Sequence, residues 1–347
     1  MTKSIYFIAI VLVCAPILLP SCVAKNYTSE IFHFNDNGDN LQAVINIPKD
    51  IDQKSSIPLV VFVHGDSEMS ADNFGYYIPI WDHLAEHGIA SMAWDKKGVG
   101  GSTGNWLDQS MLDRAQEVVS AIEAVRIHSN HSFSSIGLIG FSQAGWVLPQ
   151  VPSISDYPDY MISVSGAINW KRQSNYLTRS RLEGLGKSDT DIAQGLTENE
   201  KTLTLFDKSY AEYLAYIEAK CKESDESDCS PMSRDRFRFV QKNTNADATE
   251  DLKKVRCPVF GMFGEHDLNV DFQESFDTYQ TILSETMPED YQVKIYPNAT
   301  HGLLQSDKFN AITPGLWIWL KMRLYGKRAF VDGVLDDITA FILANNQ

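Results

Sequence analysis

The stretch Ile136-Gly137-Leu138-Ile139-Gly140-Phe141-Ser142-Gln143-Ala144-Gly145 decides how this chain is interpreted. Its apolar beginning predicts a buried strand, and the apolar residues that follow from Trp146 predict a helix. A serine between a strand and a helix, with small residues two positions to either side, is typical of a sharp turn that exposes the hydroxyl group. Gly140 and Ala144 occupy those two positions. We therefore interpret Ser142 as a candidate nucleophile.

Two further strands carry the residue types that an activated serine requires. The apolar run Val259 to Gly264 predicts a buried strand, and Asp267 follows it closely. Gln292 to Tyr296 predicts another strand, which leads into a loop that ends at His301 beside a glycine. Because the carboxyl ends of parallel strands meet at one edge of a sheet, these side chains are expected to converge there.

The chemistry explains why these types belong together. A serine hydroxyl is a weak nucleophile, so an adjacent imidazole must take its proton during attack on a carbonyl group. A carboxylate then fixes the tautomer of the imidazole and stabilises its charged form. We assign Ser142 as nucleophile, His301 as base and then acid, and Asp267 as the orienting acid. The alternatives near the acid position, each of which also fits an ordinary loop residue, are Glu265, His266 and Asp271.

An oxyanion formed during acyl transfer needs hydrogen-bond donors, and backbone N–H groups commonly supply them. The residue after the nucleophile normally gives one, so Gln143 fits that role. The second is expected after an earlier strand, and the apolar run Pro58 to Val63 leads to Asp66, whose N–H group we choose. His64, at the end of that run, is interpreted as a packed strand-end residue.

With these residues in place, the chain resembles the α/β-hydrolase superfamily, and in particular exported bacterial serine hydrolases related to esterases and to the catalytic domains of prolyl-oligopeptidase-like peptidases. The resemblance implies a mainly parallel central sheet with helices on both faces. It also implies a structured turn near the active site for the segment that begins at Asp95. The segments that carry it are His64-Gly65, Asp95 to Ser102, Ser142 to Trp146, Gly264 to Asp267, and Thr300 to Gly302.

Periodicity gives the same α/β organisation independently. An N-terminal hairpin is followed by strands that alternate with helices, which is typical of a parallel sheet covered on both faces. We expect one catalytic domain over residues 25–347, with an inserted helical cap at about 167–253. The predicted elements, besides those above, are strands at 30–34, 41–47, 89–94 and 160–164, and helices at 77–87, 111–128, 192–205 and 210–219.

The cap and a nearby loop offer aromatic side chains for a substrate pocket. Trp106, in the loop after the Asp95 segment, is the preferred pocket candidate. The cap aromatics could line an acyl pocket, although packing of the cap onto the domain is the favoured interpretation. They are Trp170, Tyr176, Phe206, Tyr210, Tyr213 and Tyr216.

Residues 1–24 read as a targeting segment. Lys3 precedes the apolar stretch Ile5 to Leu19, which is short for a membrane-spanning helix. Cys22 lies in a sequence similar to a bacterial lipoprotein box and would become the lipidated N-terminus; this interpretation is favoured. Cleavage after Ala24 would instead release a soluble protein. Both routes predict export, either to the periplasm or cell envelope with membrane attachment through a lipid, or as a secreted protein.

The cysteines, the spacing of possible metal ligands and the net charge allow further predictions about disulfides, metals and partners. Export permits disulfides, and Cys221 and Cys229 flank a short acidic loop that a bridge could close, whereas Cys257 is interpreted as a packed thiol. No His/Cys cluster has metal-ligand spacing, and the proposed chemistry needs no cofactor, so we predict neither a metal nor a cofactor. The net charge of −15 disfavours a nucleic-acid partner.

The sequence therefore predicts a serine hydrolase that cleaves carboxylic esters through an acyl-enzyme. The first alternative is a serine peptidase acting on short peptides, which would need a site for a charged peptide terminus. A binding protein that keeps the fold without turnover is a third reading, disfavoured because every required group is present.

Overall fold

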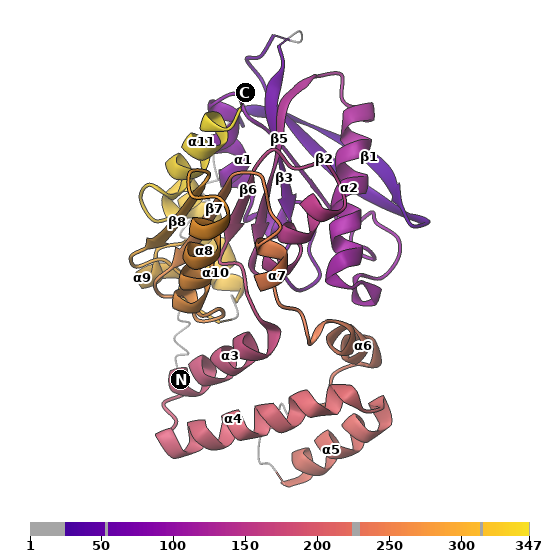
Figure 1. Ribbon diagram of the computed structural model, residues 1–347, viewed down its shortest axis with the longest axis vertical. Helices are drawn as coiled ribbons and strands as arrows, with labels where there is room; N and C mark the ends of the chain where they lie inside the picture. Colours follow the sequence, from indigo (N-terminus) through magenta and orange to yellow (C-terminus); the bar gives the residue numbers. More distant parts are fainter. Residues whose placement is uncertain (1–24, 53–54, 224–229, 313–314, 347) are drawn as a thin grey trace, which may run out of the picture.

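A computed structural model describes residues 25–52, 55–223, 230–312 and 315–346. Within these residues the chain forms an eight-stranded sheet in the order β1-β2-β4-β3-β5-β6-β7-β8 (Figure 1). The strands are β1 Tyr27–Asp36, β2 Asp39–Pro48, β3 Ile57–Val63, β4 Ala90–Trp94, β5 Phe133–Phe141, β6 Met161–Val164, β7 Val259–Gly264 and β8 Tyr291–Tyr296.

Most neighbouring strands run parallel, as predicted. From β4 to β8 every pairing is parallel, whereas the N-terminal β1–β2 hairpin joins β4 in antiparallel fashion. The hairpin is longer than its sequence pattern predicted because it closes on a tight turn. Asn37 and Gly38 both have positive φ, 52° and 92° respectively, which suits a two-residue hairpin turn.

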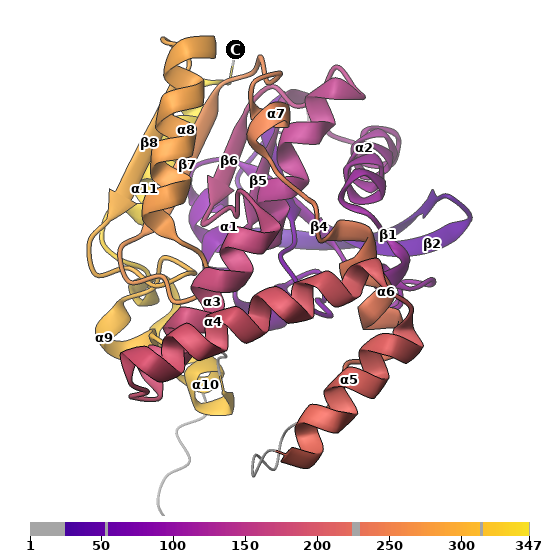
Figure 2. The same cartoon turned by 60° about the horizontal axis from the view of Figure 1, so that its bottom comes forward.

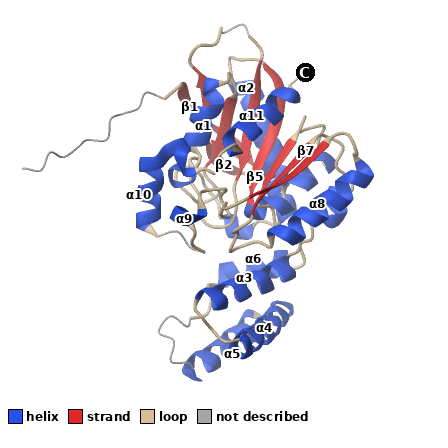
Figure 3. Cartoon of the chain, turned by 90° about the vertical axis from the view of Figure 1, so that its left-hand side faces the viewer, coloured by secondary structure: helices blue, strands red, loops and turns tan. Residues whose placement is uncertain are grey.

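Helices cover both faces of the sheet. Consecutive β3 residues alternate between two hydrophobic cores: Val61 packs in one, and Phe62 in the other. The helices α2 and α8 complete the first core, and α1 and α11 complete the second (Figure 3). The helices are α1 Ile78–Glu86, α2 Met111–His128, α3 Trp170–Gly184, α4 Asp189–Thr204, α5 Tyr210–Glu223, α6 Arg234–Asn243, α7 Thr249–Leu252, α8 Phe272–Thr286, α9 Ser306–Phe309, α10 Leu316–Tyr325 and α11 Val334–Ala344.

The helix predicted after the candidate nucleophile differs from the structure in type. The chain there forms two short 3₁₀ segments, η3 Ser142–Trp146 and η4 Leu148–Ser153. Pro149 and Pro152 lie in η4, and proline cannot donate the backbone hydrogen bond that a continuing α-helix requires. The apolar pattern was nevertheless a correct sign of burial, because Trp146 and its apolar neighbours are buried.

Helices α3 to α6 lie between β6 and β7 in the chain, and we call them the cap. They gather beyond one edge of the sheet, with α4 and α5 farthest from the strands (Figures 1 and 2). Two of them match the predicted helical segments at 192–205 and 210–219, whereas α3 and α6 had not been predicted individually. The cap is therefore positioned to cover whatever lies at that edge.

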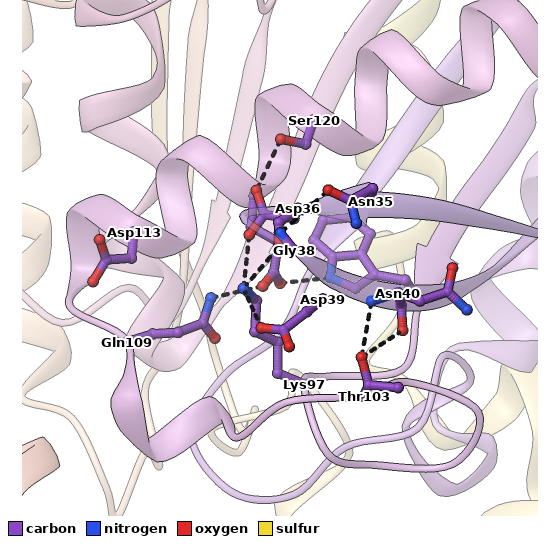
Figure 4. Close-up of polar contacts among 12 residues, drawn as sticks. Asn35, Asp36, Gly38, Asp39, Asn40, Lys97, Thr103, Gln109, Asp113 and Ser120 are labelled. Atoms are coloured by element: carbon purple, nitrogen blue, oxygen red, sulfur yellow. Dashed lines mark hydrogen bonds and ion pairs between the residues drawn. The ribbon is translucent and has the colours of Figure 1, made fainter.

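A buried lysine fastens the segment after β4 to the N-terminal hairpin (Figure 4). Lys97 Nζ lies 2.8 Å from Asp36 Oδ2 and 3.0 Å from Asp39 Oδ2. Asp36 also accepts a hydrogen bond of 2.9 Å from the hydroxyl of Ser120 on α2. Although burial opposes the charge on Lys97, its hydrogen bonds to Asp36 and Asp39 raise its pKa. The structured turn expected at Asp95 thus has a firm attachment.

Several predictions concern residues outside this description. The leader at 1–24, with Cys22, and Cys229 are among them. Cys221 is disulfide-bonded, and its pairing with Cys229 stays a prediction.

Cys257 is a free thiol, and burial raises its pKa to about 12, so it is a poor nucleophile. Within the described ranges, no helix is both long enough and apolar enough to span a bilayer.

Candidate active site

Ser142 occupies a strained turn directly after β5. Its φ is 55°, a region that residues other than glycine rarely adopt and that is typical of functional turns. Close packing behind the turn keeps it sharp: a Cβ atom on Gly145 would lie 2.6 Å from the backbone nitrogen of Ala167. Ala167 N–H in turn donates to the Ser142 carbonyl oxygen at 3.2 Å. The chain thus holds Ser142 in the geometry that the sequence predicted.

Asp267 and His301 form a hydrogen-bonded pair. His301 Nδ1 lies 2.7 Å from Asp267 Oδ2, and the carboxylate is buried, with 1% of its side chain exposed. The other oxygen, Oδ1, accepts backbone N–H groups from Asn269 and Val270 at 2.8 and 2.9 Å. With Asp267 held as the acceptor, Nδ1 of His301 is the donor, which leaves Nε2 as the basic nitrogen.

The other candidates for the orienting residue have hydrogen-bond partners other than His301. Asp271 caps α8 by accepting the N–H groups of Gln273 and Glu274. Glu265 accepts the N–H of Asn298 at 3.1 Å. His266 Nδ1 lies 2.7 Å from Ser306 Oγ. Asp267 is thus the carboxylate that contacts His301.

Tyr76 contacts a chain neighbour of Ser142 and a chain neighbour of His301. Its ring packs edge-on against Phe141, the residue before Ser142, with 5.6 Å between ring centroids. Its hydroxyl donates a hydrogen bond of 2.7 Å to the carbonyl of Gly302, the residue after His301. The serine and the imidazole therefore lie at the same edge of the sheet, around one buried tyrosine.

The loop after β3 approaches the candidate nucleophile. A Cβ atom on Gly65 would lie 3.3 Å from Ser142 Cβ, so the backbone passes close to the serine. Lys96 Nζ donates to the carbonyl oxygens of Gly65 and Ser67, at 2.8 and 2.9 Å, on either side of Asp66. Among the described residues, the Asp66 N–H has no hydrogen-bond acceptor. This loop, residues 64–67, is called the oxyanion loop below.

Side chains link the two predicted oxyanion donors to each other. Gln143 Nε2 donates to Asp66 Oδ1 at 3.1 Å. Gln143 Oε1 accepts a 2.6 Å hydrogen bond from Arg114, which also donates to the His64 carbonyl at 2.5 Å. Arg236 of the cap binds Asp66 through both carboxylate oxygens, at 2.8 and 2.6 Å. These side-chain contacts connect Arg114 on α2, through Gln143 and Asp66, to Arg236 on α6.

The charge on Asp66 is stabilised by this network. Burial alone would raise its pKa, but the hydrogen bonds and positive charge of Arg236 outweigh that effect and lower the pKa to about 2. His64, in contrast, carries no charge: burial lowers its pKa to about 3. Its Nε2 lies 2.6 Å from the Trp94 carbonyl oxygen. His64 is thus a neutral packed residue, as its sequence context indicated.

A cavity of about 290 Å³ opens at Ser142 and extends under the cap. Asp66 and Arg236 lie on its wall, whereas Asp267, His301 and Trp106 are not among its lining residues. The other lining residues are uncharged: Ser142, Gln143, Trp146, Ala167, Trp170, Gln173, Ser174, Leu177, Asn199, Thr202, Leu203, Phe206, Met232 and Val240.

The aromatic candidates fall into two groups. Trp106 is buried beneath Arg236, whose guanidinium carbon lies 5.6 Å from the ring centroid, so it supports the cavity wall without facing the cavity. Of the cap aromatics, Trp170 and Phe206 line the cavity. The others make contacts of their own: Tyr210 stacks on Tyr213, Tyr176 donates to the Asp267 carbonyl, and Tyr216 donates to Glu198.

Three basic residues around the oxyanion loop were not singled out from the sequence as members of the site: Lys96, Arg114 and Arg236. Each lies on a different element, and no local spacing connects them. Arg114 and Lys96 are almost fully buried, which is unusual for charged side chains and becomes visible only in the fold. In the described part of the chain, no group of three or more His, Cys, Asp or Glu residues is placed to hold a metal ion.

The sheet order, the strained turn and the strand-end residues define this protein as an α/β-hydrolase. More narrowly, the chain belongs to the family described as serine aminopeptidase, S33, whose model matches residues 54–308. The curated proteins contain no match.

Solved structures share the fold at low sequence identity. An esterase of Pyrococcus furiosus has a TM-score of 0.57 at 12% identity, covering 92% of this chain and 91% of its own. Est1E of Butyrivibrio proteoclasticus, solved with ferulic acid bound, has a TM-score of 0.53 at 16% identity, with 90% and 96% covered. An acylaminoacyl peptidase of Pyrococcus horikoshii has a TM-score of 0.51 at 16% identity, with 81% of this chain and 39% of the peptidase covered.

Proposed function

We propose that this protein is a serine hydrolase that cleaves carboxylic esters through an acyl-enzyme intermediate. The observation that carries the proposal is the hydrogen bond between His301 and the buried carboxylate of Asp267, at the edge of the sheet where Ser142 lies in a strained turn. The cavity under the cap is lined by Ser142 and not by His301. An acyl group could therefore enter the cavity while the leaving group departs on the side of His301.

The proposed reaction uses each group in turn. His301 Nε2 takes the proton of Ser142 as the serine oxygen attacks the ester carbonyl, while Asp267 stabilises the imidazolium. The N–H groups of Gln143 and Asp66 donate to the oxyanion. The tetrahedral intermediate collapses as His301 returns the proton to the departing alcohol. Water, activated by the same imidazole, then hydrolyses the acyl-enzyme and regenerates the serine.

The cavity favours esters over peptides with a charged terminus. The only charged residues that line it are Asp66 and Arg236, and they neutralise each other as an ion pair. An aminopeptidase would need a carboxylate for the substrate ammonium group, and Asp66 is already engaged on both of its oxygens. One of the structural neighbours, from Pyrococcus furiosus, is described as an esterase, which agrees with this preference.

The peptidase reading remains the second candidate because the family description names a serine aminopeptidase. A binding protein without turnover is a third and weaker reading. Strain at Ser142 has a free-energy cost, and a fold that served only for binding would have no need to keep it.

A fluorophosphonate probe tests the nucleophile without a guess about the substrate. We expect the wild-type protein to be labelled and Ser142→Ala to remain unlabelled with an unchanged melting temperature. A panel that pairs p-nitrophenyl esters with aminoacyl p-nitroanilides then separates the two enzyme readings. Faster turnover of the anilides would favour the peptidase, and no labelling at all would favour the binding protein.

We also propose export of the protein, with a lipid on Cys22. The supporting evidence is the predicted leader at 1–24 alone. Mass spectrometry of the mature N-terminus distinguishes the routes: a diacylglycerol-modified Cys22 supports anchoring, and a free Lys25 supports soluble release.

A further inference from the structure

Helix α10 exposes large apolar side chains over much of its length. The exposed fractions are 72% for Leu316, 81% for Trp317, 42% for Leu320 and 74% for Leu324. Positions four apart share one face of a helix, so three of these leucines form a row, and Trp317 lies beside it. The opposite side packs onto the protein through Met322, which is buried. The helix is thus seated on the fold with an apolar face turned outward.

The apolar face continues beyond the helix. Phe74 of η1, Asn73–Gly75, is 58% exposed, and its ring lies 6.0 Å from that of Trp319. Single exposed apolar residues are common on protein surfaces, but a contiguous group of this kind marks an interaction site. Figure 3 shows α10 near α1, on the side of the molecule away from α8. We call Phe74, Leu316, Trp317, Leu320 and Leu324 the apolar patch.

The charge of the segment that carries α10 differs from that of the whole protein. The chain carries a net charge of −15, yet the stretch from Gly315 to Arg328 contains four basic residues and no acidic one. Lys327 is paired with Asp82 and Glu86. Arg323 and Arg328 are exposed, and neither forms an ion pair with another described residue. Unpaired basic side chains next to exposed apolar ones suit an anionic lipid surface.

The first residues that the structure describes lie beside the segment that follows α10. Asn26 donates to Asp82 through its backbone N–H at 2.9 Å and to Glu86 through its side chain at 3.0 Å. These are the two carboxylates that bind Lys327, one residue past the C-cap of α10. Because an extended chain spans about 3.5 Å per residue, a lipid on Cys22 would be attached within roughly 14 Å of Asn26.

We propose that α10 docks on the surface of an anionic phospholipid bilayer. Leu316, Trp317, Leu320 and Leu324 would enter the boundary between head groups and acyl chains, where tryptophan is favoured. Arg323 and Arg328 would meet lipid phosphates. A single helix face of this kind binds at the interface and does not span the membrane. The proposal is independent of the proposed hydrolase activity, because it uses none of the residues assigned to the reaction.

The test is vesicle co-sedimentation of the chain from Lys25 onward, which is the product expected from cleavage after Ala24. Every sample then lacks both the apolar leader and Cys22, so neither of them can attach the protein to the vesicles. Leu316→Ser/Trp317→Ser/Leu324→Ser removes the most exposed part of the patch on α10. The matched control is Ile127→Ser, because Ile127 is 87% exposed on α2, which packs into the core on the other side of the sheet from Met322 of α10. Vesicles contain either phosphatidylcholine alone or phosphatidylcholine with phosphatidylglycerol.

We expect the parent and Ile127→Ser to bind the anionic vesicles equally and the triple variant to bind about tenfold less or weaker still, given the apolar surface removed. A change of both arginines to glutamine should reduce binding to the anionic vesicles more than to the neutral ones. Near-ultraviolet circular dichroism verifies that the triple variant is folded. The proposal is overturned if the parent does not bind, if the triple variant binds like Ile127→Ser, or if sedimentation equilibrium shows a dimer that only the triple variant dissociates.

Discussion

Arg236 and Asp66 are separated by 170 residues in the sequence, yet they form a two-point ion pair with N–O distances of 2.8 and 2.6 Å. One residue belongs to the cap and the other to the oxyanion loop. Paired hydrogen bonds between guanidinium and carboxylate groups fix orientation as well as distance. The position of the cap is therefore coupled to the position of the Asp66 N–H, which we assign as an oxyanion donor.

This coupling predicts the effect of Arg236→Gln. The variant cannot hold both carboxylate oxygens, so the oxyanion loop loses its constraint from the cap. Since removal of one oxyanion donor costs about 10²–10³ in kcat, we expect misplacement of the donor to lower kcat for a soluble ester by about tenfold to a hundredfold. KM should change less, because the interaction strengthens in the transition state. Steady-state kinetics measures both constants.

Arg234→Gln is the matched control. Arg234 lies on the same helix, and its guanidinium stacks on Tyr210 within the cap and does not contact the oxyanion loop. Its kcat should remain within about twofold of the wild-type value if only loop positioning matters. An equal loss in both variants would show that any disturbance of α6 impairs the enzyme, and the coupling would be wrong.

The same pair predicts how stability depends on pH. The pKa of Asp66 falls from an ordinary value of 3.8 to about 2 in the folded protein. A depressed carboxyl pKa contributes stability that is complete above the unfolded value and is lost as the pH falls through the folded value. Both side chains are partly exposed, so the contribution is small, below about 1 kcal/mol.

Denaturant unfolding of the wild type and Arg236→Gln measures this contribution. The difference between their midpoints should be constant from pH 7 to pH 5 and should shrink between pH 4 and pH 2. A difference that stays the same down to pH 2 would mean that the ion pair does not contribute to stability.

Local patterns predicted the strands and the residues at their ends. Ser142 and Asp267 follow strands that apolar runs identify, and His301 follows the strand predicted at Gln292 to Tyr296. Parallel strands bring such ends to one edge. Arg236 could not be found in this way. An arginine in a polar helix is typical of a solvent-exposed face, and its partner is determined only when the cap folds back over the sheet. Trp106 was predicted to be a pocket residue, but it supports Arg236 from below and is not among the residues that line the cavity.

The orienting role of Asp267 predicts a large and specific loss of activity. Asp267→Asn can no longer accept the Nδ1–H of His301 as a carboxylate does, so the wrong tautomer is stabilised and the imidazolium loses its counter-charge. We expect kcat to fall by about 10⁴, by analogy with the same change in serine proteases. Asp271→Asn is the control, because Asp271 caps α8 and does not contact His301. If Asp271→Asn caused the larger loss, the acid would have to be reassigned.

The buried contact of Lys97 predicts a change in stability without a change in chemistry. Lys97→Met leaves Asp36 without its cationic partner, and the side chain of Asp36 is only 3% exposed. Removing one member of a buried ion pair typically costs about 3–5 kcal/mol. Lys254→Met, at an exposed pair with Asp251, should cost less than about 1 kcal/mol. Urea unfolding compares the two, and similar midpoints would contradict a structural role for Lys97.

The sharpness of the turn at Ser142 depends on Gly145. A methyl group there would lie 2.6 Å from Ala167 N and 2.7 Å from the Gly166 Cα, and these are backbone atoms that no side-chain rotation can move away. Gly145→Ala must therefore shift either the turn or the start of the cap, and we expect it to lower the free energy of unfolding by about 1–3 kcal/mol.

Gly184→Ala is the control, since a methyl group at Gly184 meets no atom within 4 Å at the end of α3. There the smaller entropy cost of ordering alanine should make the change neutral or stabilising, by up to about 1 kcal/mol. Guanidinium unfolding separates the two variants, and because the displaced segment carries the nucleophile, Gly145→Ala should also slow labelling by the fluorophosphonate probe while Gly184→Ala does not. Equal stability and equal labelling of the two variants would show that the elbow does not need this close approach.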